Sequence, residues 1–170
     1  MEINHIDTRI KIQQRQLCMN CPSRLDCKEG ETIKLGFGNI NANKVIVLPS
    51  YNLYEKGNYI SGASVLIKYV GYDKLLEDYY VTRDIKCWNV SSYDTHDTCA
   101  SLCAPILTSE LSRINAKHLF VFGNVDLSVI HRIILKKFVI HRILNPYVML
   151  TEVEPLKNTF LEQIDKMKNI

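Results

Sequence analysis

Short apolar runs separated by polar stretches form the clearest pattern along the chain. The β-branched run KVIVL at 44–48 ends at Pro49 and predicts a buried strand. Similar patterns predict three further strands, within 78–88, 118–123 and 145–153. We expect these strands to lie together in one mostly parallel sheet.

The stretches between and after the strands have apolar residues at helical spacing. They predict helices at 61–76, 98–114 and 126–138, with Pro105 either kinking the second helix or starting a new one. The stretch 155–170 predicts a C-terminal amphipathic helix. Its apolar face is expected to consist of Leu156, Phe160, Leu161, Ile164 and Met167. Because strands alternate with helices, we expect a three-layer α/β domain.

Length and composition favour a single domain over 1–170, which begins with a polar arm at 1–17. The 170 residues, of which 46% are hydrophobic, are enough to build one sizeable core. The formal net charge of +3 excludes the strong basic field of a histone-like protein, but it allows a local basic groove.

The sequence contains no signal for export or membrane insertion. Residues 1–11 lack the apolar run of a signal peptide, and no window approaches the roughly eighteen apolar residues of a membrane span. Six cysteines without an export signal indicate a reducing compartment, where thiols bind metal or stay reduced. We therefore expect a cytoplasmic protein with no membrane partner, or one in the host cytoplasm if the protein is viral.

Four cysteines are the strongest candidates for chemistry. Cys18 and Cys21 form a C-x-x-C pair, whereas Cys87 and Cys103 are single thiols far along the chain. This spacing suits a cluster held by four thiolates from three parts of a folded domain. The alternatives are a structural zinc on the same four residues, or buried thiols that bind nothing.

Two other cysteines leave the ligand set open. Cys99 lies one helical turn before Cys103, so either thiol could face the metal. Cys27 follows the C-x-x-C pair closely and belongs to an alternative set. We expect both Cys27 and Cys99 to be ordinary core or surface residues.

The order of the motifs resembles that of the iron–sulfur uracil-DNA glycosylases (family 4 and its relatives). A C-x-x-C pair is followed by a G-x-G stretch, a buried strand, a strand ending in Lys-Cys, and a further cysteine sixteen positions on. The similarity covers roughly 18–125. The matching segments are CMNCPSRL at 18–25, LGFGN at 35–39, KVIVL at 44–48, YYVTRDIKC at 79–87, Cys103 and HLFVFG at 118–123.

This resemblance implies a four-stranded, mostly parallel α/β/α sandwich with a [4Fe–4S] cluster at one edge. The implied ligands are Cys18, Cys21, Cys87 and Cys103. In that family the cluster is structural, orders loops near the DNA and takes no redox part in the reaction.

The catalytic positions depart from the family pattern. The family has an acidic residue just after its first strand, where this chain has the neutral Ser50, with Asn52 two positions further on. Asn52 is a weak candidate for orienting a water molecule, because asparagine in a turn usually serves the turn. The late His-Pro motif is also missing, since Glu154 precedes Pro155.

The base-reading positions have changed as well. Arg83 replaces the asparagine that reads the base, and an arginine offers only donors to a pyrimidine edge. Tyr59 lies where the family stacks an aromatic ring on the flipped base. Asp84 is a second weak candidate for activating water, although neighbours on a strand face opposite sides of the sheet.

These changes favour a DNA-associated protein that lacks ordinary uracil excision and acts in replication, repair or a viral accessory role. A basic stretch at 130–144, with Arg132, Lys136 and Lys137, is expected to meet phosphates, although an ordinary helix with a solvated cationic side has the same pattern. The alternative is an active glycosylase that removes uracil or another modified base with non-standard residues. A third reading is a module that binds a replication or repair protein through exposed aromatic residues.

Overall fold

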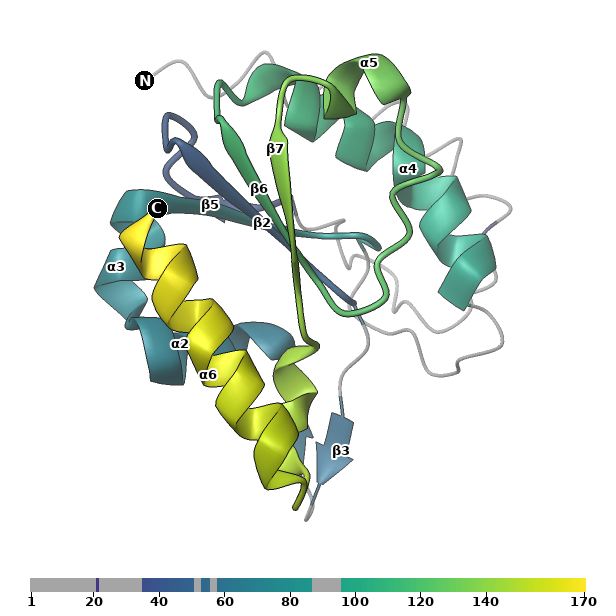
Figure 1. Cartoon of the computed structure of the whole chain (residues 1–170). Helices are drawn as coiled ribbons and strands as arrows, with labels where there is room; N and C mark the ends of the chain where they lie inside the picture. Colours follow the sequence, from purple (N-terminus) through teal and green to yellow (C-terminus); the bar gives the residue numbers. More distant parts are fainter. Residues whose placement is uncertain (1–20, 22–34, 51–52, 56–57, 87–95) are drawn as a thin grey trace.

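A five-stranded sheet forms the centre of the molecule (Figure 1). The computed structural model describes residue 21 and residues 35–50, 53–55, 58–86 and 96–170. The strands are arranged in the order β1-β5-β2-β6-β7. Their bounds are Phe37–Gly38 for β1, Lys44–Leu48 for β2, Tyr79–Arg83 for β5, His118–Phe122 for β6 and Val139–Ile143 for β7.

Strands β5, β2, β6 and β7 run parallel, and only the short β1 is antiparallel, paired with β5. The chain passes from β2 to β5 on one side and then returns past β2 to β6 and β7 on the other. Such a reversal opens a crevice at the carboxyl ends of the strands, which is where α/β proteins usually bind ligands. An α/β fold with a mostly parallel sheet is therefore confirmed.

Helices cover both faces of the sheet (Figure 1). One face is covered by α2 (Gly62–Val70), α3 (Tyr72–Asp78) and α6 (Glu154–Asn169), and the other by α4 (His96–Arg113) with the short α5 (Arg132–Leu135). Alternate residues of β2 point into the two cores, which explains why its whole run is apolar.

The prediction of a four-stranded sheet was wrong in the number of strands, which is five, and in the position of the last strand. The last parallel strand is β7, whereas 145–153 contains the 3-10 helix η3 (Pro146–Leu150). The predicted helix over 126–138 shrinks to the four residues of α5. β7 is an edge strand, and its residues Val139 and Ile140 are exposed. An edge strand does not need the continuous apolar run of a buried strand, and the sequence VIHRI has no such run. The fifth strand is β1, which has only two residues.

Two glycines allow β1 to lie on β5. Gly38 has a φ of +94°, and a Cβ atom there would lie 2.3 Å from the carbonyl oxygen of Tyr79. A Cβ on Gly36 would lie 2.6 Å from the ring of Tyr80. Only glycine fits both positions, which gives the LGFGN segment a structural explanation.

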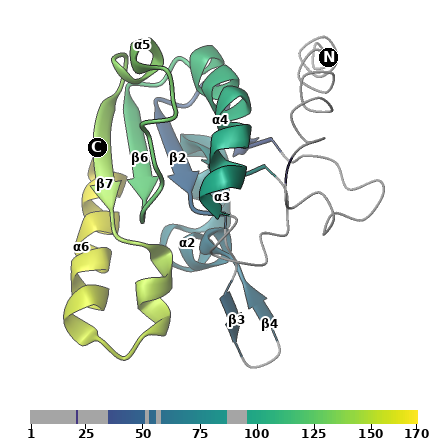
Figure 2. The same cartoon turned by 90° about the vertical axis from the view of Figure 1, so that its right-hand side faces the viewer.

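A small hairpin follows the carboxyl end of β2. Its strands are β3 (Leu53–Glu55) and β4 (Asn58–Ile60), and it projects away from the sheet (Figure 2). The sequence predicted no strand between 49 and 60, so this hairpin is an addition that the structure makes. Among the helices of the described ranges, none combines the length and apolarity needed to cross a membrane.

The C-terminal helix is confirmed as amphipathic. Phe160, Ile164 and Met167 of α6 are buried against the sheet. Leu156 is instead exposed near the start of the helix, so the predicted apolar face is shorter than expected.

Candidate functional site

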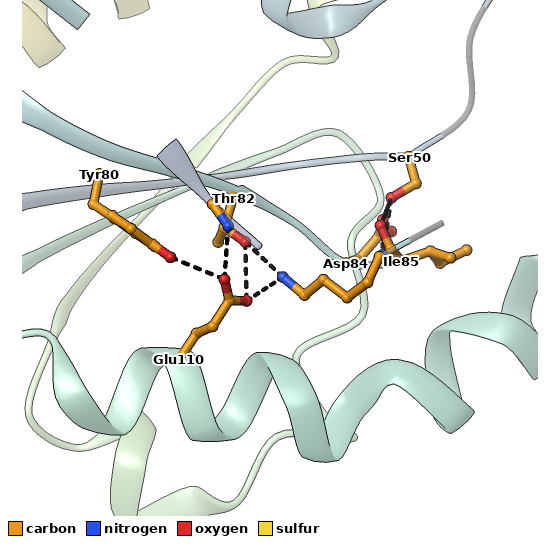
Figure 3. Close-up of polar contacts among 8 residues, drawn as sticks. Ser50, Tyr80, Thr82, Asp84, Ile85 and Glu110 are labelled. Carbon is orange, nitrogen blue, oxygen red and sulfur yellow. Dashed lines mark hydrogen bonds and ion pairs between the residues drawn. The ribbon is translucent and has the colours of Figure 1, made fainter. Parts of the chain in front are cut away.

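Buried polar side chains gather where β2 and β5 end. Ser50 follows β2, while Asp84 and Lys86 follow β5, and Glu110 of α4 forms an ion pair with Lys86; Figure 3 shows Ser50 with Asp84, and Glu110 with Tyr80 and Thr82. Because the two strands are neighbours and parallel, their exits meet at one edge of the sheet. This edge is the place that the family resemblance indicates for chemistry.

Ser50 and Asp84 form a compact clasp between the two strand exits. The Oγ of Ser50 lies 2.5 Å from Oδ1 of Asp84 and 2.8 Å from the carbonyl oxygen of Ile85. The backbone N–H of Ile85 donates to Ser50 Oγ at 2.8 Å and to Asp84 Oδ1 at 2.7 Å. Both polar side chains are buried, with 1% of Ser50 and 3% of Asp84 exposed. The arrangement holds a carboxylate next to the strand exits, but it encloses that carboxylate in the protein.

A second network is centred on the buried Glu110. Its Oε1 accepts hydrogen bonds from the Tyr80 hydroxyl at 2.9 Å and from the backbone N–H of Gly36 at 2.8 Å. Its Oε2 accepts one from Thr82 Oγ1 at 3.1 Å and forms an ion pair with Lys86. The ammonium group of Lys86 also donates to Thr82 Oγ1 at 2.5 Å. Glu110 therefore joins α4 to β5 and to the residues before β1.

Burial and charge act against each other in this network. Burial lowers the pKa of Lys86, and the negative charge of Glu110 opposes that change most strongly. Burial also raises the pKa of the Tyr80 hydroxyl, and the nearby Glu110 carboxylate raises it further. Two opposite charges this deeply buried stabilise one another only while both are present.

Three cysteines lie close to this edge. Cys99 and Cys103 are buried on α4 and pack with Ile85, while the half-buried Cys21 packs against the same small cluster. The sulfurs of Cys21 and Cys99 are 3.6 Å apart. Cys99, which we expected to be an ordinary residue, is thus brought to the same place as Cys103. The signal for it was its spacing of one helical turn from Cys103.

The remaining predicted ligands, Cys18 and Cys87, lie outside the described residues, as does Cys27. Within the described ranges, no three His, Cys, Asp or Glu side chains converge to hold a metal by themselves. Cys87 nevertheless follows Lys86 directly in sequence, at the end of the segment that packs against the cysteine cluster. A four-cysteine centre here would need at least one of the thiols of Cys18, Cys27 and Cys87.

The donor chemistry of the described cysteines fits a thiolate-bound metal. Two thiolates on one tetrahedral zinc, each about 2.3 Å from the ion, lie about 3.8 Å apart. The 3.6 Å between Cys21 and Cys99 is close to that value. In a four-iron cluster each thiolate binds a different iron, which places the sulfurs further apart.

The residues predicted to contact a base or a phosphate lie in two separate places, and those near the carboxyl ends of β2 and β5 come first. Arg83 ends β5 near the buried network, and its pKa is lowered mainly by burial, against the opposing charges of Tyr147 and Asp84. Tyr59 lies on β4 opposite Tyr54, in the hairpin that follows β2. Asn52 lies outside the described residues.

Arg132 of α5 and Lys136, which directly follows this helix, belong to the opposite end of the sheet. The helix precedes β7, whose first residue pairs with His118, the first residue of β6. Ser50 instead follows the last residue of β2, at the carboxyl ends of the strands, whereas Figure 1 shows α5 beside the amino end of β7. The side chains of Arg132 and Lys136 are exposed. The topology therefore separates these two predicted phosphate contacts from Arg83 and Tyr59, which were predicted at the base-reading positions.

Lys137 has a structural role in this region. Its ammonium group donates to the carbonyl oxygens of Leu111 at 2.5 Å, Ser112 at 3.3 Å and Ile114 at 2.7 Å. These carbonyls lie at the carboxyl end of α4, where a cation is favourable. Lys137 therefore caps α4, while the phosphate contacts predicted for Lys137, Arg132 and Lys136 stay predictions.

No protein-family model matches the chain, and no curated protein matches its sequence. The cysteine cluster and the arrangement of the strands therefore carry the functional argument.

Proposed function

We propose that this protein is a cysteine-ligated metal protein on a uracil-DNA glycosylase-like α/β/α sandwich, and that it associates with DNA without ordinary uracil excision. The proposed centre is a structural [4Fe–4S] cluster on Cys18, Cys21, Cys87 and Cys103. One observation carries the proposal. Cys21 and Cys103, 82 positions apart in the sequence, pack in one small cluster beside the segment that leads to Cys87.

The sheet supports the proposed sandwich. Four parallel strands, helices on both faces and a reversal of strand order next to β2 are what such a fold requires. The short β1 adds an antiparallel edge to this arrangement. The resemblance to the glycosylases does not require that strand.

The buried clasp supports the absence of ordinary excision. The family's acid would follow β2, where Ser50 stands and donates its hydroxyl proton within the clasp. Among the described residues, Asp84 is the carboxylate next to Ser50 that was predicted as a candidate for activating water. Its Oδ1 already accepts from Ser50 and Ile85, and the side chain is almost fully buried. A general base must instead reach the water that it activates.

The same clasp is the observation that favours the alternative function. Asp84 places a carboxylate next to the exit of β2, supplied by the neighbouring strand rather than by β2 itself. If Ser50 released it, that carboxylate would lie close to the position of the family's acid. An active glycosylase with non-standard residues is therefore the second candidate.

Association with DNA is proposed to use the exposed cations of α5. Arg132 and Lys136 are on the surface, and contacts of this kind bind phosphate without reading sequence. Accessory roles in replication, repair or a viral system, with a replication or repair protein as partner, are consistent with such binding.

The experiment that tests this function combines base release with binding. Metal-loaded protein is incubated with single- and double-stranded DNA that contains uracil, and binding is measured from low to high salt. We expect salt-sensitive binding with no released base. Released uracil, lost on Asp84→Asn, would instead establish the alternative. Binding to neither DNA would overturn the proposed association.

Zinc is the second candidate for the metal, because of the short distance between Cys21 and Cys99. Serine variants distinguish the ligand sets. With the proposed set, Cys103→Ser removes the metal and Cys99→Ser retains it. The reverse result would place Cys99 in the ligand set.

A further inference from the structure

The face of α4 that meets β5 carries both the cysteines and the carboxylate of the buried network. Cys99, Cys103 and Glu110 are separated by four and seven residues. At about 100° per residue, seven residues complete two turns to within roughly 20°, and four residues overshoot one turn by about 40°. The three side chains therefore point to nearly the same side of the helix.

The other half of this arrangement belongs to the segment after β5. Lys86 lies directly before Cys87 in sequence. Its buried ammonium group forms an ion pair with Glu110 of α4. The same pair of elements thus carries two thiol positions and the two charges that join them.

We propose that the ion pair between Lys86 and Glu110 is the positioning element of the metal centre: it fixes the rotation and height of α4 against the end of β5, and so holds Cys103 in the position from which it binds the metal. This inference rests on the proposed metal centre. Lys86 and Glu110 are positioning residues and are not ligands themselves.

A purely stabilising role would explain this pair poorly. Buried ion pairs often contribute no more stability than well-packed apolar residues of the same volume, because both charges must leave water. A directional pair instead selects one arrangement of the helix. Rotating α4 by one residue would turn Glu110 by about 100°, and sliding it by one turn would move it about 5.4 Å. Either movement would break the ion pair and displace the cysteines together.

Glu110 is buried and also binds groups other than Lys86. It holds Tyr80 and Thr82 of β5 and the backbone of Gly36 before β1. Each contact fixes α4 in a different direction. Groups that orient metal ligands without binding the metal affect metal affinity by about 10- to 100-fold in known centres.

The test compares four forms of the full chain: wild type, Glu110→Gln, the double variant Lys86→Met/Glu110→Leu, and Leu107→Ala. The Gln variant keeps the shape of Glu110 and removes its charge. The double variant replaces both charges with apolar side chains, which is expected to preserve folding. Leu107 is buried in the same helix and packs in the large core, so its truncation is a matched control for lost stability.

Each form is loaded anaerobically with iron and sulfide, or with zinc, and metal retention is measured against a chelator at a temperature where circular dichroism reports a folded protein. We expect the Gln and double variants to bind the metal about 10- to 100-fold more weakly than wild type, with altered absorption spectra. Leu107→Ala should lower the melting temperature and leave metal affinity and spectrum as in wild type.

Two outcomes overturn the inference in distinguishable ways. If wild type binds metal and the folded double variant binds it equally well with the same spectrum, the positioning role is wrong and the metal centre stands. If wild type binds neither iron nor zinc, the metal centre itself is wrong and the inference falls with it.

Discussion

The two ends of the sheet hold their charged groups in opposite ways. At the carboxyl ends, Lys86 and Glu110 are buried, carry opposite charges and bond to each other. Towards the amino ends, the tilted rings of His118 and His141 are in contact, with 3.1 Å between Nδ1 of His118 and Nε2 of His141, and both are half-buried. Buried opposite charges fix geometry, whereas partly exposed basic groups respond to pH and to partners. The proposed metal centre lies at the first of these ends, and the proposed contact with DNA lies at the second.

The largest loss of stability is expected when one charge of the buried pair of Lys86 and Glu110 is removed alone. Glu110→Leu leaves Lys86 buried without its carboxylate and is expected to lower the free energy of unfolding by about 3–5 kcal/mol. Urea unfolding at pH 7 measures the loss. The double variant Lys86→Met/Glu110→Leu should recover most of it. Equal losses in the single and double variants would contradict the role of the unpaired charge.

A smaller effect is expected at the neighbouring clasp. Ser50→Ala removes the hydroxyl that bonds Asp84 and the backbone of Ile85, and should cost about 1–3 kcal/mol because buried polar groups lose a partner. Chemical unfolding again provides the measurement. If the same variant gains base-releasing activity, the clasp restrains a working carboxylate, and the alternative function gains support.

At the other end of the sheet, the pair of His118 and His141 is expected to make the free energy of unfolding depend on pH. Burial lowers the pKa of His118 from its ordinary 6.5, and the positive charges of His141, Lys117 and Lys44 lower it further. Below pH 6.5 the unfolded chain then binds more protons than the folded one, so stability falls as the pH drops towards the folded value. Unfolding measured at pH 7.5 and 5.5 should show a larger drop for wild type than for His141→Gln. An equal drop in both would contradict the repulsion.

The smallest change in stability is expected on α5. The double variant Arg132→Ala/Lys136→Ala replaces two exposed cations and should alter the free energy of unfolding by less than about 0.5 kcal/mol. Its DNA binding should nevertheless weaken, with a salt slope reduced by about two. Lys117→Ala is the matched control for loss of an exposed cation outside α5. An unchanged slope would move the proposed interface elsewhere.

The sequence predicted the interior of the fold better than its edges. The runs at 44–48 and 118–123 became β2 and β6, because strands covered on both faces must be apolar throughout. The edge strands β1 and β7 gave no such signal, since one is two residues long and the other is half exposed. Helix and strand also compete for the mixed basic and apolar residues around 130–144, and only pairing with β6 decides between them.

The candidate site was predictable only in part, for a similar reason. The spacing of Cys99 and Cys103 allowed either to face the metal, and the structure brings both to Cys21. The partnership of Lys86 with Glu110 joins residues 24 positions apart and depends on how α4 docks on β5. No local pattern in the sequence contains that information. The Lys-Cys pair was visible, but its lysine had no assigned partner.

The most direct test of the central claim is the metal content of the full-length protein purified without oxygen, compared with Cys103→Ser. The account predicts a brown protein with about four irons per chain and broad absorption in the visible range, both lost in the variant. One zinc per chain would contradict the iron–sulfur cluster and support a tetrahedral site that includes Cys21 and Cys99. A protein that holds neither metal would contradict the metal centre altogether.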